Sequence, residues 1–156
     1  MNATLTGPRT LWFIDNLAAV RVDGKTSGGA FDLVEVEARR GDMPPLHVHA
    51  ETDETFTVLE GRLSLHLPDR SLELDAGESF LAPRGVPHVY RVESEQARWL
   101  AVGNPPGFAG FVREASDPAE GDGFPPASHR PDLERVGAAA ARHGIELLGP
   151  PGTLPA

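Results

Sequence analysis

Short runs of apolar or alternating residues recur through the first part of the chain, and turn-forming residues separate them. In RLSLHL (residues 62–67) three leucines share one face of an extended chain while the polar residues share the other, which is the period of a half-buried β-strand. Many short strands at this spacing favour a sandwich or barrel over a parallel α/β sheet. The runs predict strands at 11–14, 18–22, 31–37, 56–59, 62–67, 71–74, 79–82, 86–92 and 98–102.

The character of the chain changes after residue 103. Residues 104–130 carry Pro and Gly repeatedly and predict a loop with one short helical turn, whereas residues 131–143 predict a helix. Pro131 suits the first helical position, and Leu133 begins an apolar stripe. Gly144 suits the position just beyond the last turn.

Composition narrows the classes of function. The 156 residues carry a net charge of -9, which opposes binding to nucleic acids and to anionic membranes. Cysteine is absent, so disulfides and thiolate metal sites are excluded. No apolar run approaches a membrane-spanning length, and the first residues lack the features of a signal peptide. We expect a cytoplasmic protein, and the strong preference for Arg over Lys is typical of a GC-rich bacterial gene.

Two histidines one residue apart, His47 and His49, raise the question of a metal site. On a strand their side chains leave the same face with Cα atoms roughly 6.5 to 7 Å apart, and both imidazoles can then reach one ion. If residues 50–53 form a hairpin turn, Glu54 begins the partner strand and points back at the same spot. His88, shortly after a Pro-x-Gly turn, supplies a fourth donor. The histidine pair alone is equally compatible with polar positions between strands.

The other histidines and the turn acid have simpler explanations. His66 alternates onto the outward face of its strand, and His143 falls in the last turn of the predicted helix. His129 lies in a Pro-rich loop, where we expect it to be exposed. Asp53 is expected to be a solvent-facing turn residue.

The spacing of these residues resembles the two sequence motifs of the cupins. The first reads Gly41, five residues, His47-x-His49, four residues, Glu54, six residues, Gly61, and the second reads Gly77, five residues, Pro83-x-Gly85, two residues, His88. Val92 stands where the second motif usually ends in asparagine, a departure that touches no ligand position. LWFIDNLAAVRV, DETFTVLEG and PRGVPHVYRV further resemble the small single-domain cupins of the quercetin 2,3-dioxygenase-like type.

The resemblance implies a fold and a cofactor. The fold is an all-β, single cupin barrel (a double-stranded β-helix or jelly-roll) over about 10–103 with a C-terminal α-helix, in one domain over 1–156. The cofactor is one divalent transition-metal ion, and iron, nickel, manganese, cobalt, copper and zinc all suit a site rich in imidazole. Glu54 is then both a ligand and the candidate catalytic base. The implied metal ligands are His47, His49, Glu54 and His88.

On this resemblance we expect a metal-dependent dioxygenase that acts with dioxygen on a small aromatic or enediol compound. A non-catalytic binding or sensing cupin and a metal-dependent isomerase or epimerase are the alternatives. Phe56, Val58 and Tyr90 share strand parity with the ligands, so they either line a substrate pocket or form plain barrel core. Residues 108–111 and the C-terminal helix cover either one mouth of the barrel or an outer apolar face. A homodimer is expected if the strand at 11–14 is an unpaired sheet edge.

Overall fold

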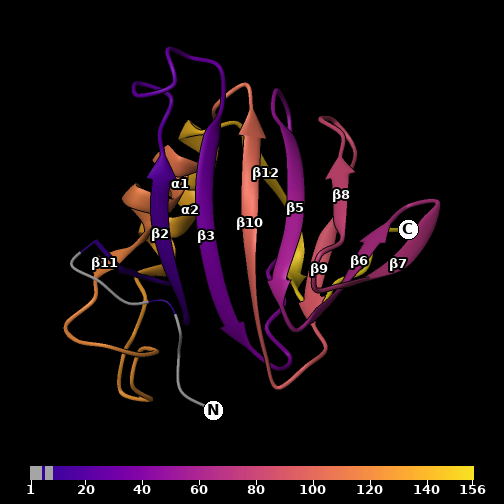
Figure 1. Ribbon diagram of the computed structural model, residues 1–156. Coiled ribbons are helices and arrows are strands. Elements are labelled where there is room, and N and C mark those ends of the chain that lie inside the picture. Colours follow the sequence, from indigo (N-terminus) through magenta and orange to yellow (C-terminus); the bar gives the residue numbers. More distant parts are fainter. Residues whose placement is uncertain (1–4, 6–8) are drawn as a thin grey trace.

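Two facing layers of β-structure and two helices make up the part of the chain that the computed structural model describes, residue 5 and residues 9–156 (Figure 1). The bounds are β1 (Leu11–Phe13), β2 (Asn16–Val22), β3 (Asp32–Arg39), β4 (Pro45–His49), β5 (Asp53–Glu60), β6 (Arg62–Leu67), β7 (Arg70–Asp75), β8 (Ser79–Ala82), β9 (Val89–Val92), β10 (Gln96–Asn104), α1 (Ala109–Ala115), β11 (Asp117–Pro118), α2 (Leu133–Arg142) and β12 (Ile145–Pro151). The predicted all-β fold with a C-terminal helix is confirmed.

One layer is a seven-stranded sheet in the order β11-β1-β2-β3-β10-β5-β8, and the other contains the pair β12-β4 and the three strands β7-β6-β9. All these pairings are antiparallel. Along β5 the burial alternates strictly, so that Glu54, Phe56 and Val58 face the space between the layers. The side chains that fill this space form one continuous apolar core with α1 and α2.

The two helices lie on the side of the wide sheet that also carries β12 (Figure 1). α1 packs against β1, β2, β3 and α2, and α2 packs against β12. The helices therefore cover the part of the wide sheet that the narrower second layer leaves free. Within the described residues, neither helix is long and apolar enough to cross a membrane.

The start and the buried face of α2 differ from the prediction. Asp132, not Pro131, borders the helix, and its carboxylate accepts the backbone N–H of Arg135 at 3.0 Å. An acceptor at this position satisfies a free donor of the first turn, which proline cannot do. Leu133 is 68% exposed, whereas Val136, Ala139 and Ala140 are buried. Gly144 follows the helix with φ of 70°, as predicted.

The segment expected as a loop with one short helical turn contains a helix, α1, and also the short strand β11, which was not predicted. Because β11 pairs with β1, the strand at residues 11–13 is not a sheet edge, and the predicted reason for a homodimer is removed. His129 is not the exposed loop residue that was expected. Its ring packs edge-on against Trp12 with centroids 5.2 Å apart, and its side chain is 11% exposed. The Pro-rich loop therefore covers the indole and packs against a small second core that contains Trp12.

Gly61 and Gly77 both have positive φ, of 81° and 91°, but only Gly61 has other parts of the chain close to its Cα. A Cβ on Gly61 would lie 2.2 Å from the carbonyl oxygen of Gln96, whereas nothing lies within 4 Å of a Cβ on Gly77. We expect Gly61→Ala to lower the free energy of unfolding by about 2 to 3 kcal/mol and Gly77→Ala by about 1 kcal/mol. Urea denaturation of the two variants measures the difference. Equal losses would show that the close approach does not constrain the chain.

Tyr90, the one tyrosine of the sequence, reports on the polar end of the core. Its hydroxyl donates to Asp42 Oδ2 at 2.7 Å, and Asn16 donates to the same oxygen at 3.0 Å. Burial and the Asp42 carboxylate raise the pKa of Tyr90 well above its usual value.

The unfolded chain releases this phenol proton at about pH 10, whereas the folded protein retains it. We therefore expect tyrosinate absorbance to appear at higher pH in the native protein than in urea. Because the folded state binds this proton more tightly, the protonated phenol of Tyr90 stabilises the fold. This contribution is fully present below about pH 10 and is lost as the pH rises further. Coincident ionisation curves for native and unfolded protein would contradict the prediction.

Candidate metal centre

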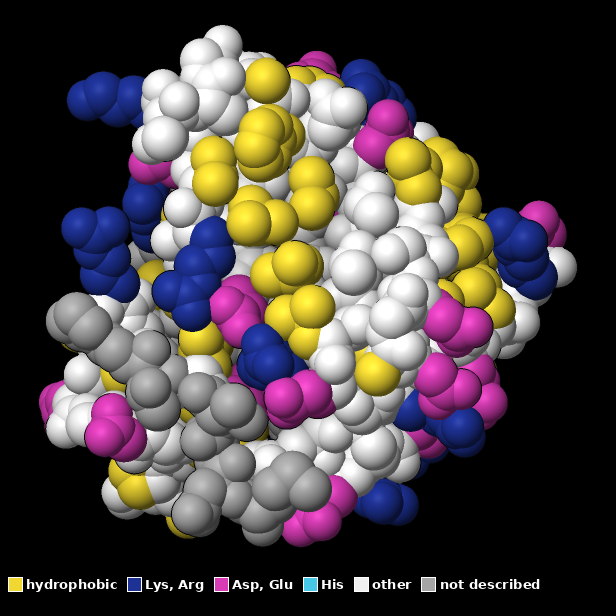
Figure 2. Space-filling view, viewed as in Figure 1, with side chains coloured by type: hydrophobic (Ala, Val, Ile, Leu, Met, Phe, Trp, Pro, Cys, Tyr) yellow, Lys and Arg dark blue, Asp and Glu magenta, His cyan; other side chains and the backbone are white. Residues whose placement is uncertain are grey.

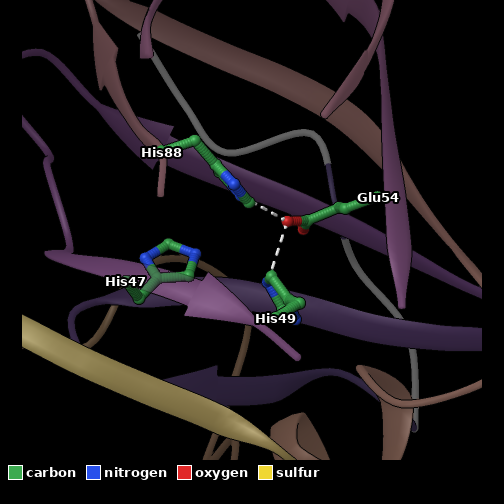
Figure 3. A group of neighbouring side chains, drawn as sticks. All are labelled: His47, His49, Glu54 and His88. Atoms are coloured by element: carbon green, nitrogen blue, oxygen red, sulfur yellow. Dashed lines mark hydrogen bonds and ion pairs between the residues drawn. The ribbon is translucent and has the colours of Figure 1, made fainter. Parts of the chain in front are cut away.

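The four residues predicted as metal ligands come together between the two layers (Figure 3). His47 and His49 project from β4, Glu54 is the second residue of β5, and His88 immediately precedes β9. Each offers one ligand atom, and these four atoms all lie within 4.8 Å of one another. The structure thus forms a compact group of three imidazoles and one carboxylate.

Strand geometry aims these side chains at one point. His47 and His49 leave the same face of β4 because they are two residues apart. His47 and His88 lie opposite each other in an antiparallel bridge, with N–H···O distances of 3.4 and 2.9 Å. Residues opposite one another in such a bridge point to the same face. Glu54 completes the group from the facing sheet.

Backbone carbonyls fix the tautomers of two histidines. His47 Nδ1 lies 2.8 Å from the carbonyl oxygen of Pro45, and His88 Nδ1 lies 3.2 Å from that of Val86. Because a carbonyl only accepts, a proton on each Nδ1 satisfies these contacts, and the tautomer that carries it presents an Nε2 lone pair to the interior. A hydrogen bond of this kind commonly supports a metal-binding histidine.

These nitrogen atoms face a carboxylate at short range. Glu54 Oε2 lies 3.0 Å from Nε2 of both His49 and His88 (Figure 3). Lone pairs and a carboxylate oxygen are all acceptors, so they need a proton or a cation between them. Within the described part of the chain, His49 Nε2 is buried and makes no hydrogen bond, despite its distance from Glu54. Three nitrogen atoms and one oxygen fit a divalent transition-metal ion.

Burial and mutual charges set the protonation of the group. Burial, reinforced by His88, lowers the pKa of His47 to about 4, so this imidazole is neutral at pH 7. Burial would lower the pKa of His49, but the Glu54 carboxylate outweighs it and raises that pKa. Burial would likewise raise the pKa of Glu54, yet His49 and His88 hold it well below its usual range. An ionised carboxylate is the form that binds a cation.

Three of the four residues of the centre are buried and His47 is partly exposed, and no described histidine side chain shows on the outer face of the wide sheet (Figure 2). Aromatic rings border the group. His49, Glu54 and His88 are 2%, 4% and 1% exposed. The ring of Phe56 meets His88 edge-on at a centroid distance of 6.0 Å, and that of Phe108 meets His49 at 6.2 Å. An apolar wall therefore stands on two sides of the group.

The three predicted pocket residues take different places in this wall. Phe56 contacts a ligand ring, as above, and its ring also lies 6.3 Å from that of Tyr90. Tyr90 packs on Trp99 at 4.9 Å, and Val58 pairs with Trp99 in the sheet register. Val58 and Tyr90 thus extend from Phe56 into the barrel core.

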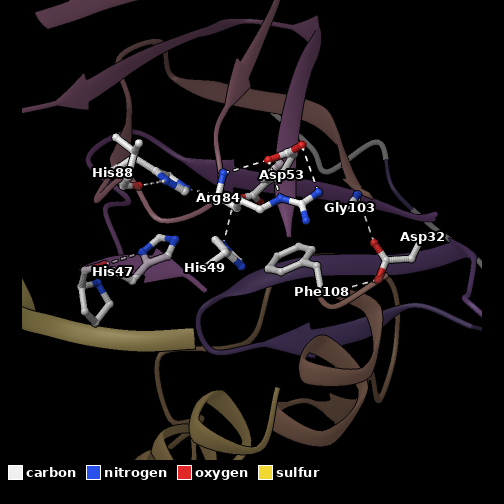
Figure 4. A network of polar contacts seen from close by, with 11 residues as sticks. Asp32, His47, His49, Asp53, Arg84, His88, Gly103 and Phe108 are labelled. Carbon is white, nitrogen blue, oxygen red and sulfur yellow. Dashed lines mark hydrogen bonds and ion pairs between the residues drawn. The ribbon is translucent and has the colours of Figure 1, made fainter. Parts of the chain in front are cut away.

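An ion pair at the rim of the barrel holds the loops around the centre (Figure 4). Arg84 donates from its backbone N–H and Nε to Asp53 Oδ1 at 2.9 and 3.1 Å, and from Nη2 to the carbonyl of Asn104 at 3.2 Å. The next residue, Gly85, donates to the carbonyl of His49 at 2.8 Å. Asp53 therefore faces solvent as expected, but it begins β5 and pairs with Arg84, whereas a turn residue was predicted. No sequence signal had indicated the role of Arg84.

A match to a known family decides the identity of this barrel. Residues 32–103 match the family described as "Cupin domain". These residues form a cupin domain. The match runs from the first residue of β3 into β10 and contains the four residues of the candidate metal centre.

The cupin domain is similar to several known proteins. The chain is 33% identical over 133 residues to quercetin 2,3-dioxygenase of Bacillus subtilis (strain 168), which is 85% of this chain and 40% of that protein. It thus spans about two fifths of that relative's length. KdgF from Halomonas sp. aligns with a TM-score of 0.53 and 19% identity, over 58% of this chain and 79% of that one. The Cnp3 cupin domain of Schizosaccharomyces pombe aligns with a TM-score of 0.53 and 15% identity, over 60% and 63%. These two structures show the fold alone.

Proposed function

We propose that the group of three histidines and Glu54 holds one divalent transition-metal ion and that the protein is a quercetinase-like dioxygenase for a small aromatic or enediol compound. The observation that carries the metal site is the carboxylate oxygen of Glu54, which faces Nε2 of His49 and His88 at 3.0 Å, with His49 Nε2 buried and without a hydrogen bond in the described structure. Similarity to the Bacillus subtilis quercetin 2,3-dioxygenase over most of this chain supports the reaction class.

Each part of the centre has a distinct task in this proposal. A bound ion of this kind supplies Lewis acidity and coordination positions for oxygen ligands. His47 and His88, fixed by their backbone hydrogen bonds, keep the site rigid before substrate arrives. Glu54 is a ligand and the acceptor for a substrate hydroxyl proton. Because its neighbours hold the pKa of Glu54 low, it accepts that proton only transiently.

The apolar surroundings favour a flat substrate. Phe56 stands beside His88 and continues into the core through Tyr90. We propose Phe56 as the pocket wall nearest the ion, with Val58 and Tyr90 behind it. Apolar side chains offer water no hydrogen-bond partner, and exclusion of water strengthens the interaction between the ion and an anionic oxygen.

Metal content and oxygen uptake test the proposal on the same preparation. The chain is purified without a His-tag or chelator, its metal content is measured, and oxygen consumption is followed with quercetin and simpler enediols. We expect about one ion per chain and one dioxygen consumed per substrate, since a dioxygenase adds both oxygen atoms to its substrate. Protein treated with a chelator should lose this uptake and regain it when the ion is restored.

The alternatives give different results in the same assay. Metal-loaded protein that binds a flavonol unchanged, without oxygen uptake, would replace the dioxygenase with a binding or sensing cupin. Conversion of an enediol without oxygen uptake would indicate an isomerase or epimerase. Protein that takes up no ion on reconstitution would overturn the metal site itself.

A further inference from the structure

Phe108 brings an aromatic ring to the metal centre from outside the matched cupin domain. It lies between the end of β10 and the start of α1, beyond residue 103. Its ring is partly buried, with the centroid 6.2 Å from that of His49 and the planes at 71°. Phe13 and Phe111 pack against the same ring at 6.3 and 6.1 Å. Phe108 is thus part of an aromatic group that extends to the ligand His49.

A buried carboxylate holds the backbone on both sides of Phe108 (Figure 4). Asp32, at the start of β3, is 1% exposed. Its Oδ2 accepts the N–H groups of Gly107, Phe108 and Ala109, each at 2.9 Å, and its Oδ1 accepts that of Gly103 at 3.1 Å. One side chain therefore joins the end of β10 to the first turn of α1.

Further contacts hold the segment between these points. Arg84 donates to the carbonyl of Asn104. A Cβ on Gly107 would lie 2.4 Å from Thr52 Oγ1, so this backbone rests directly on the loop between β4 and β5. With both ends fixed, the ring of Phe108 has little freedom to swing away from His49. The side of the centre next to His49 thus has a wall of fixed position.

We propose that Phe108 is a specificity-determining residue of the metal centre and that Asp32 is its positioning residue. The ring restricts the His49 side to small or narrow ligands, and a bulky group on a metal-bound compound collides with it. This inference rests on the metal site proposed above and adds the residue that selects among compounds able to bind the ion. It does not depend on turnover.

Ligand binding to the cobalt(II)-loaded protein tests the proposal without catalysis. Visible absorption under argon gives dissociation constants for azide, a small ligand, and 4-tert-butylcatechol, a bulky one. In Phe108→Leu we expect the dissociation constant of the catechol to fall at least about tenfold relative to wild type, while the dissociation constant of azide changes by less than about threefold. The matched variant Phe124→Leu, which changes a ring packed against the separate small core around Trp12, should leave the ratio of the two constants at the wild-type value. Equal ratios in wild type and Phe108→Leu would overturn the role of Phe108.

Asp32→Asn tests the positioning role. The asparagine amide has one accepting oxygen where the carboxylate has two, so it cannot bind all four N–H groups. We therefore expect the same shift in the ratio of the two dissociation constants as in Phe108→Leu, at unchanged cobalt content. A residue that only stabilises the fold would lower the melting temperature and leave the ratio unchanged, which would overturn the assignment of Asp32. If this variant does not fold, Gly107→Ala displaces the same segment through Thr52 and should give the same shift.

The outcome is separable from that of the proposed function. A shifted ratio without any oxygen uptake retains the role of Phe108 and rejects the dioxygenase. Protein that binds no cobalt overturns both proposals.

Discussion

Replacement of His49 by alanine is expected to lower the affinity of the chain for its metal ion by at least about 100-fold. Changes to residues that merely support a metal ligand cost 10- to 100-fold, and His49 is itself one of the four donors, so its removal costs at least as much. The lost imidazole leaves Glu54 with one histidine at 3.0 Å in place of two. Competition with a chromophoric chelator measures the affinity, and any oxygen uptake should fall with it.

His66→Ala is the matched control for this change. His66 is also a strand histidine, but its ring nitrogens lie 3.1 and 2.8 Å from the hydroxyls of Ser64 and Ser71, away from the metal centre. We expect metal content and affinity in this variant to equal those of wild type. A comparable loss in both variants would show that the ion binds elsewhere on the chain.

Replacement of Asp32 by alanine is expected to lower the free energy of unfolding by about 3 to 5 kcal/mol. The change leaves four backbone N–H groups around a buried position without their acceptor, and an unsatisfied buried donor costs about 1 to 3 kcal/mol when water cannot reach it. Water can reach the partly buried N–H groups of Gly107 and Phe108, so the total loss is smaller than four times this cost. The midpoint of urea denaturation, with the slope checked for constancy, gives the value.

Asp53→Ala provides the comparison for this prediction. Asp53 also accepts a backbone N–H at the rim of the barrel, and its ion pair with Arg84 is open to solvent. We expect a much smaller loss, because water replaces the missing acceptor. If both variants lost equal stability, burial of Asp32 would not be the source of its effect.

The ligand group was predictable because its signals are local. Spacing of two along a strand places His47 and His49 on one face, and a short turn returns the chain to Glu54. The same period predicted most strands, and β6 and β8 have the predicted bounds. His88 was proposed from its place after a Pro-x-Gly turn, and the family resemblance supported it, since nothing in its own neighbourhood indicates that β9 lies next to β4.

The features that escaped prediction depend on distant partners. Asp32 bonds to residues 71 to 77 positions away, and FDLVEV reads only as the start of a strand. β12 was missed because IELLGPP contains a glycine and two prolines, which normally mark a loop, yet it pairs with β4 from Ile145 onward. His129 appeared to be exposed because the partner that covers it, Trp12, is more than a hundred residues earlier.

The bridge between His47 and His88 has a consequence for local opening of the domain. In the described residues this bridge, together with the hydrogen bond from Gly85 to the carbonyl of His49, links the ribbon β4-β12 to the strands β9, β6 and β7. An ion bound next to this bridge would cross-link β4 to the segment before β9 and, through Glu54, to the opposite sheet. Removal of the ion should then release β4 and β12 as one unit whose amide protons exchange with solvent faster, while β3 and β10 keep their protection. The metal would thus stabilise the attachment of β12, the last strand of the fold, in addition to its part in the chemistry.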